Sequence, residues 1–401
     1  MDRINDTTLD RTLGCMIGGA VGDALGYAVE FSSWREIQGQ YGSNGIRAFQ
    51  LDRRGLAQIS DDTQMALFTA NGILFAMTRG YTYGLMARID HYCENTYIDW
   101  LHTQDWPLRK EKDYGISWLM DVPELYSRRA PGNTCLNALR AIDNGKPVEN
   151  DSCGCGGVMR TAPIALFSYI HNYLSDFEDN LLACDDCAAG AAKITHKHPL
   201  GFMPSAVLNH ILMRIMDGAC EAPDGLVSVV RKSLSALPNI KSEDNSGRTY
   251  GILFPKHVKQ LQDIVEQAIS LAGTDSPDPV AIESIGGGWT GHEALAIAIY
   301  SAVKHSDSFE DAIISAVNHS GDSDSTGAVC GNIMGCLLGR KSIPKKFIEH
   351  LELREVIEEI SHDLWTGCII DDHNHCDSAE QRKWFLKYEA HRWKEPEPSK
   401  N

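Results

Sequence analysis

Apolar residues recur at intervals of three and four along most of this chain, which is the spacing of one face of an α-helix. Strand-like alternation of apolar and polar residues is scarce. We therefore predict an all-α, single-domain helical bundle whose function is carried by the loops that connect the helices. The helical period is clearest over residues 63–77, 134–142, 182–194, 206–216, 258–271, 292–303, 309–317 and 325–338.

Two of the helical segments carry glycine at every fourth position. The first stripe consists of Gly14, Gly18, Gly22 and Gly26, and the second of Gly327, Gly331, Gly335 and Gly339. A glycine inside a helix costs about 1 kcal/mol relative to alanine, so each stripe needs a reason. The segment 325–338 is too short to span a membrane. We predict instead that two helices cross so closely in the core that their backbones touch.

The overall composition narrows the class of protein. The 401 residues are 43% hydrophobic, which is enough for a packed core, and their net charge of −17 argues against a protein that wraps nucleic acid. No apolar run suggests a membrane span, and residues 1–11 do not resemble a secretion signal. Together with 12 cysteines, this predicts reduced thiols and a cytoplasmic location. We expect one domain over residues 1–393, with a core at 13–340 and a helical C-terminal extension at 341–393, and a disordered tail at 394–401.

Two short acidic motifs lie near opposite ends of the chain. One is Ser60-Asp61-Asp62-Thr63-Gln64, and the other is Gly321-Asp322-Ser323-Asp324-Ser325-Thr326-Gly327. If the fold brings them together, their carboxylates repel one another unless a cation lies between them. Such oxygen ligands suit Mg²⁺, Mn²⁺ or Ca²⁺ better than Zn²⁺. The alternative for the first motif is an ordinary helix start, with Ser60 as the N-cap and the acids at the positive end of the helix dipole.

The second motif has two rival interpretations. An EF-hand calcium loop needs glutamate at its twelfth position, where this chain has Ile333. The Asp-x-Asp-x-Thr pattern also occurs in phosphatases whose first aspartate attacks phosphorus, but there a buried strand runs directly into that aspartate. Here the polar residues 318–321 intervene, and the phosphatase stays an alternative. A possible zinc ligand set, whose order matches no standard zinc finger, is Cys368, His373, His375 and Cys376.

Four other features could carry chemistry or be ordinary structure. Glu30 follows an apolar stretch, so it is either a surface loop residue or a buried general acid or base. The glycine-rich loop 154–157 could present backbone N–H groups to a phosphate, with Arg160 paired to that phosphate or to an internal carboxylate. Segment 286–291 could place Trp289 against a ligand ring or be a flexible turn. His196 lies at a predicted helix end, where a capping or hydrogen-bonding role is the ordinary one.

Taken in order along the chain, these motifs resemble those of the ADP-ribosylglycohydrolases. That family includes the ADP-ribosylarginine hydrolases and the glycohydrolase that reactivates dinitrogenase reductase. No single motif is decisive, but chance is a poor explanation for so many in the right order. The matching segments are 14–26 with Glu30, 60–63, 131–134, 154–160, 195–196, 286–289, 293–296 and 321–327.

The resemblance implies a compact all-α fold with a central dinuclear metal site that usually holds two Mg²⁺ or Mn²⁺ ions. Glu30 matches the acid that helps to activate water or to protonate the leaving group. Many relatives have threonine at the positions of Ser60 and Ser325, which is a mild departure because serine keeps the oxygen ligand. The implied metal ligands are Ser60, Asp61, Asp62, Asp322, Asp324 and Ser325.

The resemblance also implies a pocket for ADP-ribose. In some relatives an aspartate that precedes the position of Gly132 is proposed to aid ribose opening. This chain has Ala130-Pro131 there, so we assign no such role. The residues that would line the pocket are Gly132, Asn133, Thr134, Cys155, Gly156, Gly157, Met159, His196 and Trp289.

The expected function is therefore metal-dependent hydrolysis of an N-glycosidic bond that removes ADP-ribose from a modified protein, with arginine as the expected acceptor. Such an enzyme reverses an ADP-ribosyltransferase, and in toxin immunity a cognate ADP-ribosyltransferase would be a second partner. One alternative is another linkage, such as ADP-ribosyl-serine or O-acetyl-ADP-ribose. Another is a protein that acts mainly by binding and blocking a partner, although the complete set of acidic positions argues against a purely structural role.

Overall fold

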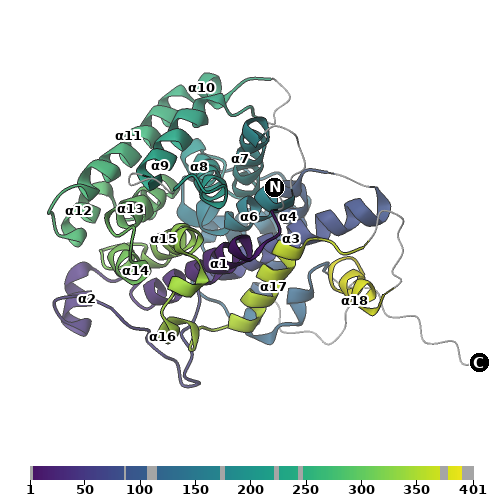
Figure 1. Cartoon of the computed structure of the whole chain (residues 1–401), viewed down its shortest axis with the longest axis horizontal. Helices are drawn as coiled ribbons and strands as arrows, with labels where there is room; N and C mark the ends of the chain where they lie inside the picture. The colour runs from purple at the N-terminus through teal and green to yellow at the C-terminus, as the bar shows by residue number, and fades with distance from the viewer. Residues whose placement is uncertain are drawn as a thin grey trace, which may run out of the picture.

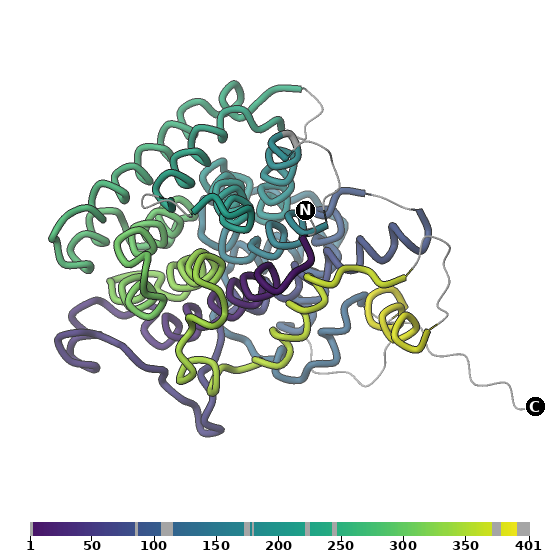
Figure 2. The backbone as a smooth tube through the Cα atoms, in the orientation of Figure 1, coloured from purple at the N-terminus to yellow at the C-terminus, as the bar shows by residue number. Residues whose placement is uncertain are grey.

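α-Helices form nearly all the regular structure of the described residues, which are 3–84, 87–105, 115–171, 177–220, 225–242, 247–370 and 378–390. Within these ranges extended segments meet only in isolated β-bridges, such as the one between Ala57 and Leu351. The all-α prediction is therefore confirmed in this computed structural model (Figures 1 and 2). No helix in the described ranges combines the length and the apolar character needed to cross a lipid bilayer.

The helices agree closely with the predicted segments, and only segment 182–194 extends past its helix, by one residue. The α-helices are α1 (Asp6–Tyr27), α2 (Trp34–Tyr41), α3 (Asp61–Tyr83), α4 (Ile89–Asp105), α5 (Asn133–Asp143), α6 (Ala162–His171), α7 (Phe177–Lys193), α8 (Pro199–Met216), α9 (Gly225–Ala236), α10 (Tyr250–Leu253), α11 (Pro255–Ala272), α12 (Asp278–Ile285), α13 (Gly291–Lys304), α14 (Phe309–Val317), α15 (Ser323–Leu338), α16 (Lys345–Ile348), α17 (Arg354–Thr366) and α18 (Ala379–Tyr388). The 3₁₀ helices are η1 (Trp118–Asp121), η2 (Pro123–Tyr126), η3 (Cys155–Arg160), η4 (Leu237–Asn239) and η5 (Arg340–Ser342).

Helices α1 and α15 form the centre of the molecule (Figure 1). Helices α13 and α14 pack against α15, and α17 packs against α1. Helices α10 to α12 lie toward the upper left of the view, and α18 lies toward the lower right. Helix α1 is buried from Gly14 to Gly26 and α15 from Ser323 to Cys336, so the segments that follow α1 and precede α15 start from a rigid frame.

The two glycine stripes face each other across this central contact, in antiparallel order. Gly18 lies against Gly331 and Gly22 against Gly327, and a Cβ atom added to either partner would overlap a carbonyl oxygen of the other helix. The amide of Asn332 also donates to the carbonyl oxygen of Cys15 at 2.9 Å. The predicted close crossing of two glycine-rich helices is confirmed. Because α1 and α15 run in opposite directions, the end of α1 meets the start of α15.

Replacing Gly22 by alanine should lower the free energy of unfolding by about 2 kcal/mol or more, because the added methyl group meets backbone that cannot move aside. Gly39→Ala is the matched control, since Gly39 lies inside α2 with no atom near its missing Cβ. That control should stabilise the protein by about 0.5–1 kcal/mol. Urea unfolding of both variants measures the two effects. Equal stabilities would contradict the close crossing.

The segment after residue 340 packs on the rest of the fold. The Ala57 N–H donates to His350 O at 2.7 Å, and Trp384 Nε1 donates to Thr78 Oγ1 at 2.9 Å. Trp365 Nε1 likewise donates to the hydroxyl of Thr8 in α1 at 3.1 Å. The C-terminal extension is therefore joined to the N-terminal part of the sequence. The predicted disordered tail, 394–401, lies outside the described residues, and the domain boundaries stay a prediction.

Candidate functional site

Three carboxylates meet where α1 ends and α15 begins. Glu30, Asp322 and Asp324 each offer an oxygen atom, and these oxygens lie within 4.8 Å of one another. Asp322 is the N-cap of α15, where its side chain accepts from the Ser325 N–H at 3.4 Å, and Asp324 lies in the first turn. Glu30 follows α1, with its N–H donating to Gly26 O at 2.9 Å. The close crossing of the two helices thus sets the position of the acids.

The first acidic motif joins the same site from the start of α3. Ser60 is the N-cap of α3, and its hydroxyl accepts from the Asp62 N–H at 3.1 Å, so the motif is also an ordinary helix start. Asp61 and Asp62 are buried, and after burial the charge of Asp324 is the next largest cause that raises the pKa of each carboxyl. The fold therefore brings the two motifs together. We call Glu30, Asp61, Asp62, Asp322 and Asp324 the carboxylate cluster.

Burial and mutual repulsion shift the protonation of this cluster strongly. Burial first, and the charge of Asp324 next, raise the pKa of Glu30 to about 10. The same causes in the same order raise the pKa of the Asp322 carboxyl well above its usual range. Without a compensating positive charge, Glu30 therefore retains its proton at neutral pH.

The cluster has the chemistry of a site for hard divalent cations. In the part of the chain that the structure describes, none of its carboxylates forms an ion pair with lysine, arginine or histidine. Glu30 Oε2 and Asp62 Oδ2 are buried oxygens that lack a hydrogen-bond partner among the described residues. Buried polar atoms are normally satisfied, and Mg²⁺ and Mn²⁺ take oxygen ligands. The residues present therefore fit a divalent cation.

Sequence reasoning missed Asp23, which lies in α1 beneath the start of α3. Its fully buried carboxylate accepts from the Ser60 N–H at 2.9 Å, from the Thr63 N–H at 3.1 Å and from the Thr63 hydroxyl. Burial, followed by the charge of Asp324, raises the pKa of Asp23 to about 7. Asp23 thus anchors the first acidic motif on the central helix. The available signal was an acid next to the glycine stripe, in the apolar second half of α1.

Glu352, from the C-terminal extension, was also missed, and it holds the loop that leads into the first motif. Only 2% of its side chain is exposed. It accepts from Arg54 Nη2 at 2.8 Å, from Arg129 Nη2 at 3.1 Å and from the Ile59 N–H at 3.2 Å. The carbonyl oxygen of Arg129 in turn accepts from the Asp61 N–H at 3.1 Å. Glu352 therefore fixes the backbone on both sides of the approach to Asp61.

Replacing Glu352 by glutamine should lower the free energy of unfolding by about 2 kcal/mol, because charge-assisted hydrogen bonds to two guanidinium groups become neutral ones. It should also weaken Mn²⁺ binding about tenfold, as removal of an outer partner commonly does. Urea unfolding and calorimetric titration with MnCl₂ measure the two effects. Glu349→Gln, an exposed change nearby in sequence, is the control. Unchanged Mn²⁺ affinity would leave Glu352 with a purely structural role.

The predicted loop 132–134 lies beside the cluster. The Gly132 N–H points to Asp61 Oδ2 at 3.4 Å, and Gly132 is the N-cap residue of α5. Asn133 begins that helix, and Thr134 Oγ1 lies 3.1 Å from Ser152 Oγ. The first N–H groups of a helix have no partner within the helix, and at this position, beside the cluster, they suit an anionic ligand.

The predicted loop around residue 155 lies on the other side, where it forms the 3₁₀ helix η3. The Cys155 thiol lies against Asp322. Burial, and after it the charge of Asp322, raises the pKa of this thiol. Met159 Sδ lies 3.9 Å from the Ser325 hydroxyl, so η3 also contacts the start of α15. Gly157 lies against the carbonyl oxygen of Gly201, where a side chain would not fit.

His196 supports this loop from the protein interior. A Cβ atom added to Gly154 would lie 3.2 Å from the His196 ring, and one added to Gly156 would lie 3.0 Å from it, so the ring packs closely against the loop. His196 Nδ1 lies 2.9 Å from Thr195 Oγ1, and burial lowers the pKa of the ring to about 3. His196 is therefore neutral and buried behind the glycine-rich loop.

Three other sequence interpretations have different outcomes. Arg160 is fully buried and donates to Thr195 Oγ1 at 2.7 Å and to Ala191 O at 3.1 Å, with its guanidinium over the Tyr97 ring, so no carboxylate pairs with it in the described residues. The phosphatase interpretation is wrong, because Asp322 is a helix N-cap that follows α14 rather than a strand. Of the possible zinc ligands, only Cys368 lies within the described residues.

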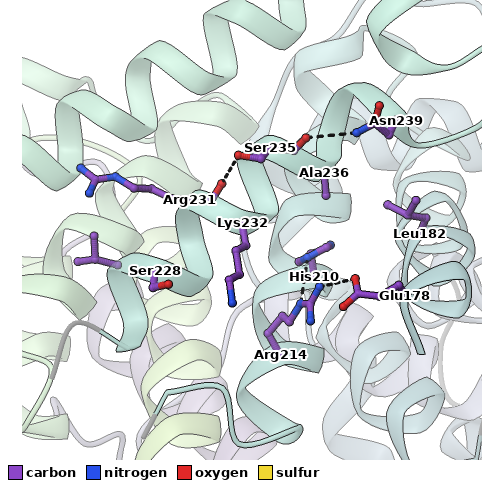
Figure 3. A pocket seen from close by; sticks show the side chains of 11 residues that line it. Glu178, Leu182, His210, Arg214, Ser228, Arg231, Lys232, Ser235, Ala236 and Asn239 are labelled. Carbon is purple, nitrogen blue, oxygen red and sulfur yellow. Dashed lines mark hydrogen bonds and ion pairs between the residues drawn. The ribbon is translucent and has the colours of Figure 1, made fainter. Parts of the chain in front are cut away.

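A separate groove lies between α7, α8 and α9 (Figure 3). It has a volume of about 920 Å³ and includes the cations Arg214, Arg231 and Lys232. Arg214 pairs with Glu178 and donates to His210 Nε2 at 3.4 Å, whereas Arg231 pairs with a glutamate outside the groove. This groove offers no cluster of acids, so the carboxylate cluster is the stronger candidate for catalysis.

Comparisons with known proteins agree with this site. The ADP-ribosylglycohydrolase family model matches residues 4–373. The chain is 26% identical to ADP-ribosyl-[dinitrogen reductase] glycohydrolase of Rhodospirillum rubrum, over 86% of this chain and 91% of that protein. It is 39% identical to ADP-ribosylarginine hydrolase Tri1 of Serratia proteamaculans, but over only 16% of this chain and 18% of that protein.

The chain spans only 57% and 60% of the length of two further curated relatives. A solved structure described as an ADP-ribosylglycohydrolase-related protein complex has the same fold, with a TM-score of 0.57 at 23% identity over 90% of this chain and 99% of that one. The family model covers nearly the whole chain and includes each acidic motif. The chain therefore belongs to the ADP-ribosylglycohydrolase family.

Proposed function

We propose that this protein is a metal-dependent hydrolase that releases ADP-ribose from modified proteins, with arginine-linked ADP-ribose as its substrate. The observation that carries the proposal is the carboxylate cluster, in which two buried oxygens have no hydrogen-bond partner within the described ranges. Membership of the family supports the reaction class. A relative described as an ADP-ribosylarginine hydrolase supports the acceptor.

Two divalent cations, Mg²⁺ or Mn²⁺, would be held between the starts of α3 and α15. Such ions would polarise a water molecule and bind the ribose hydroxyl groups. The side chains that would bind them from α3 are Ser60, Asp61 and Asp62. Those that would bind them from α15 are Asp322, Asp324 and Ser325.

Glu30 would carry the proton transfer. In the metal-free fold its raised pKa keeps a proton on the carboxyl. With cations bound the pKa would lie nearer neutral pH, and the group could donate a proton to the departing nitrogen of the acceptor. The carboxylates around it would stabilise the positive charge that develops on the ribose ring as the bond breaks. Glu30 is only half-buried, whereas the aspartates of the cluster are buried. The acceptor side chain would therefore approach from the Glu30 side of the cluster.

The two loops beside the cluster would hold the rest of ADP-ribose. The start of α5 presents the N–H groups of Asn133 and Thr134, which suit a diphosphate. On the other side, η3 presents Cys155, Gly156, Gly157 and Met159, with His196 behind them as support. Neutral His196 leaves the charge of the loop unchanged over the physiological pH range.

The test is ADP-ribose release from an arginine-ADP-ribosylated protein, with Mg²⁺ or Mn²⁺ and with chelator. The wild type is compared with the double variant Asp61→Ala, Asp322→Ala. The expected result is metal-dependent release that the double variant loses. If the protein cleaves a serine-linked or small-molecule substrate instead, the proposed arginine acceptor is wrong and the reaction class stands. If it protects a partner without cleaving any substrate, it is a binding protein.

A further inference from the structure

Two aromatic side chains from distant parts of the chain stack on each other at the surface beside the carboxylate cluster. Phe31 is 68% exposed and Trp289 is 45% exposed. Their ring centroids lie 5.5 Å apart with an interplanar angle of 23°. Single exposed apolar residues are common, but two large aromatic rings that stack while both stay open to water form a surface suited to a ligand. We call Phe31 and Trp289 the aromatic pair.

Phe31 is tied to the catalytic side of the cluster. It directly follows Glu30 and has a φ of 66°, a left-handed conformation that is rare for a bulky residue. The Ser32 N–H donates to Val29 O at 3.0 Å, so the chain turns tightly at this point. This turn sends the Glu30 carboxyl toward Asp322 and Asp324 while the Phe31 ring stays exposed. Strained residues of this kind cluster at functional sites.

Trp289 is tied to the opposite side of the cluster. The Asp322 N–H donates to Gly287 O at 2.8 Å, and the Cys155 N–H donates to Trp289 O at 3.2 Å. A Cβ atom on Gly287 would lie 2.9 Å from the indole, so glycine is needed for the indole to fold back over its own loop. The aromatic pair therefore joins the Glu30 side of the site to the Asp322 side, at its solvent edge.

This position is where the acceptor side chain of a modified protein must lie. When the link is to arginine, the group attached to the ribose is a planar guanidinium cation, and guanidinium groups stack on aromatic faces. A serine link offers only an ether oxygen with no charge and no planar group. Resting on the proposed function, we infer that the aromatic pair binds the acceptor guanidinium and makes the enzyme select arginine-linked over serine-linked ADP-ribose.

The test uses Phe31→Leu and Trp289→Leu, which keep apolar bulk but remove the aromatic face. Peptides of one sequence, modified on arginine or on serine, serve as substrates, and the affinity for free ADP-ribose is measured separately. Each variant should raise KM about five- to thirtyfold for the arginine-linked peptide, the range of a partly desolvated cation–π contact. For Phe31→Leu, the kcat for that peptide, cleavage of the serine-linked peptide and ADP-ribose affinity should stay within about twofold, since none of them involves the guanidinium contact. Because Trp289 is also expected to line the ADP-ribose pocket, Trp289→Leu is judged by the fall in the ratio of arginine-linked to serine-linked cleavage.

Two matched changes sharpen the result. Trp289→Phe keeps an aromatic face and should restore most of the arginine preference. Ile252→Leu alters a side chain that is 66% exposed elsewhere, in α10, and should change nothing. If the wild type cleaves only the arginine link, free ADP-ribose serves as the comparison that lacks an acceptor.

Three outcomes would overturn the inference. Equal losses on both peptides together with weaker ADP-ribose binding would mean that the aromatic pair holds the ADP-ribose itself. Unchanged kinetics in both leucine variants, with an active wild type, would leave the pair without a role while the proposed function stands. A wild type that cleaves no arginine-linked substrate would end the proposed function and this inference together.

Discussion

Glu30→Gln is expected to lower kcat for ADP-ribose release by about 10²–10⁴-fold, the usual contribution of a general acid or base. Glutamine keeps the shape of the side chain and one oxygen for a cation, but it cannot give or take the proton. In the fold the pKa of Glu30 is raised to about 10, chiefly by burial and then by Asp324. A divalent cation beside the carboxyl would bring this pKa down toward neutral pH, where the group can both donate and accept.

The measurement is kcat with saturating substrate and MnCl₂, together with a thermal melt that shows an intact fold. Glu355→Gln is the control, because the side chain of Glu355 is 90% exposed and its ion pair with Arg354 spans 3.8 Å. Proton transfer by Glu30 is ruled out if the variant retains more than about a third of the wild-type kcat. A fall confined to Mn²⁺ affinity would assign Glu30 to cation binding instead.

The metal-free protein is expected to lose stability as the pH rises from about 4 through 7, and divalent cations should restore it. Asp23 has an ordinary pKa of 3.8, which burial and then the charge of Asp324 raise to about 7, and Glu30 goes from 4.5 to about 10. A raised pKa means that the folded state binds more protons than the unfolded chain. The stabilisation is therefore complete below pH 4 and is lost as the pH rises toward the folded-state values.

A cation that binds only the folded protein adds about 4 kcal/mol of stability when its concentration is 1,000 times its dissociation constant. Urea unfolding at pH 5 and pH 8, with EDTA or with MnCl₂, measures both effects. Asp324→Asn should make the metal-free protein more stable at pH 8, because it removes the charge that repels Glu30, Asp61 and Asp62. The same variant should lose most of the gain from MnCl₂.

Asp275→Asn, an exposed change, serves as the control and should leave all four conditions unchanged. A wild type that unfolds at the same urea concentration with EDTA and with MnCl₂ at pH 8 would contradict cation binding at the cluster. An Asp324→Asn variant that is less stable than wild type in EDTA would contradict the repulsion on which the pH prediction rests.

The sequence by itself determined most of the long helices and the start of α3. A helix is a local structure, so the spacing of apolar residues within 10 to 20 positions is enough to predict it. The same holds for Ser60 and Asp322, which cap helices through bonds to residues two or three positions away. The glycine stripes also predicted a close crossing of α1 and α15, because glycine at every fourth position of a helix has few other uses. The candidate site residues were predicted from the order of the motifs along the chain and the family resemblance that it carries.

Only the tertiary structure decided which of these pieces meet and what holds them. Asp23 supports the start of α3, Glu352 fixes the approach to Asp61, and Phe31 stacks on Trp289. Each contact joins residues separated by tens to hundreds of positions, so no local pattern announces it. The environment of Arg160 could not be predicted from the sequence either, because its burial against Tyr97 depends on how α4 and η3 pack. Short-range hydrogen bonds and helical periodicity depend on residues that are near one another in the sequence. The long-range contacts form only when the central helices cross and bring distant segments together.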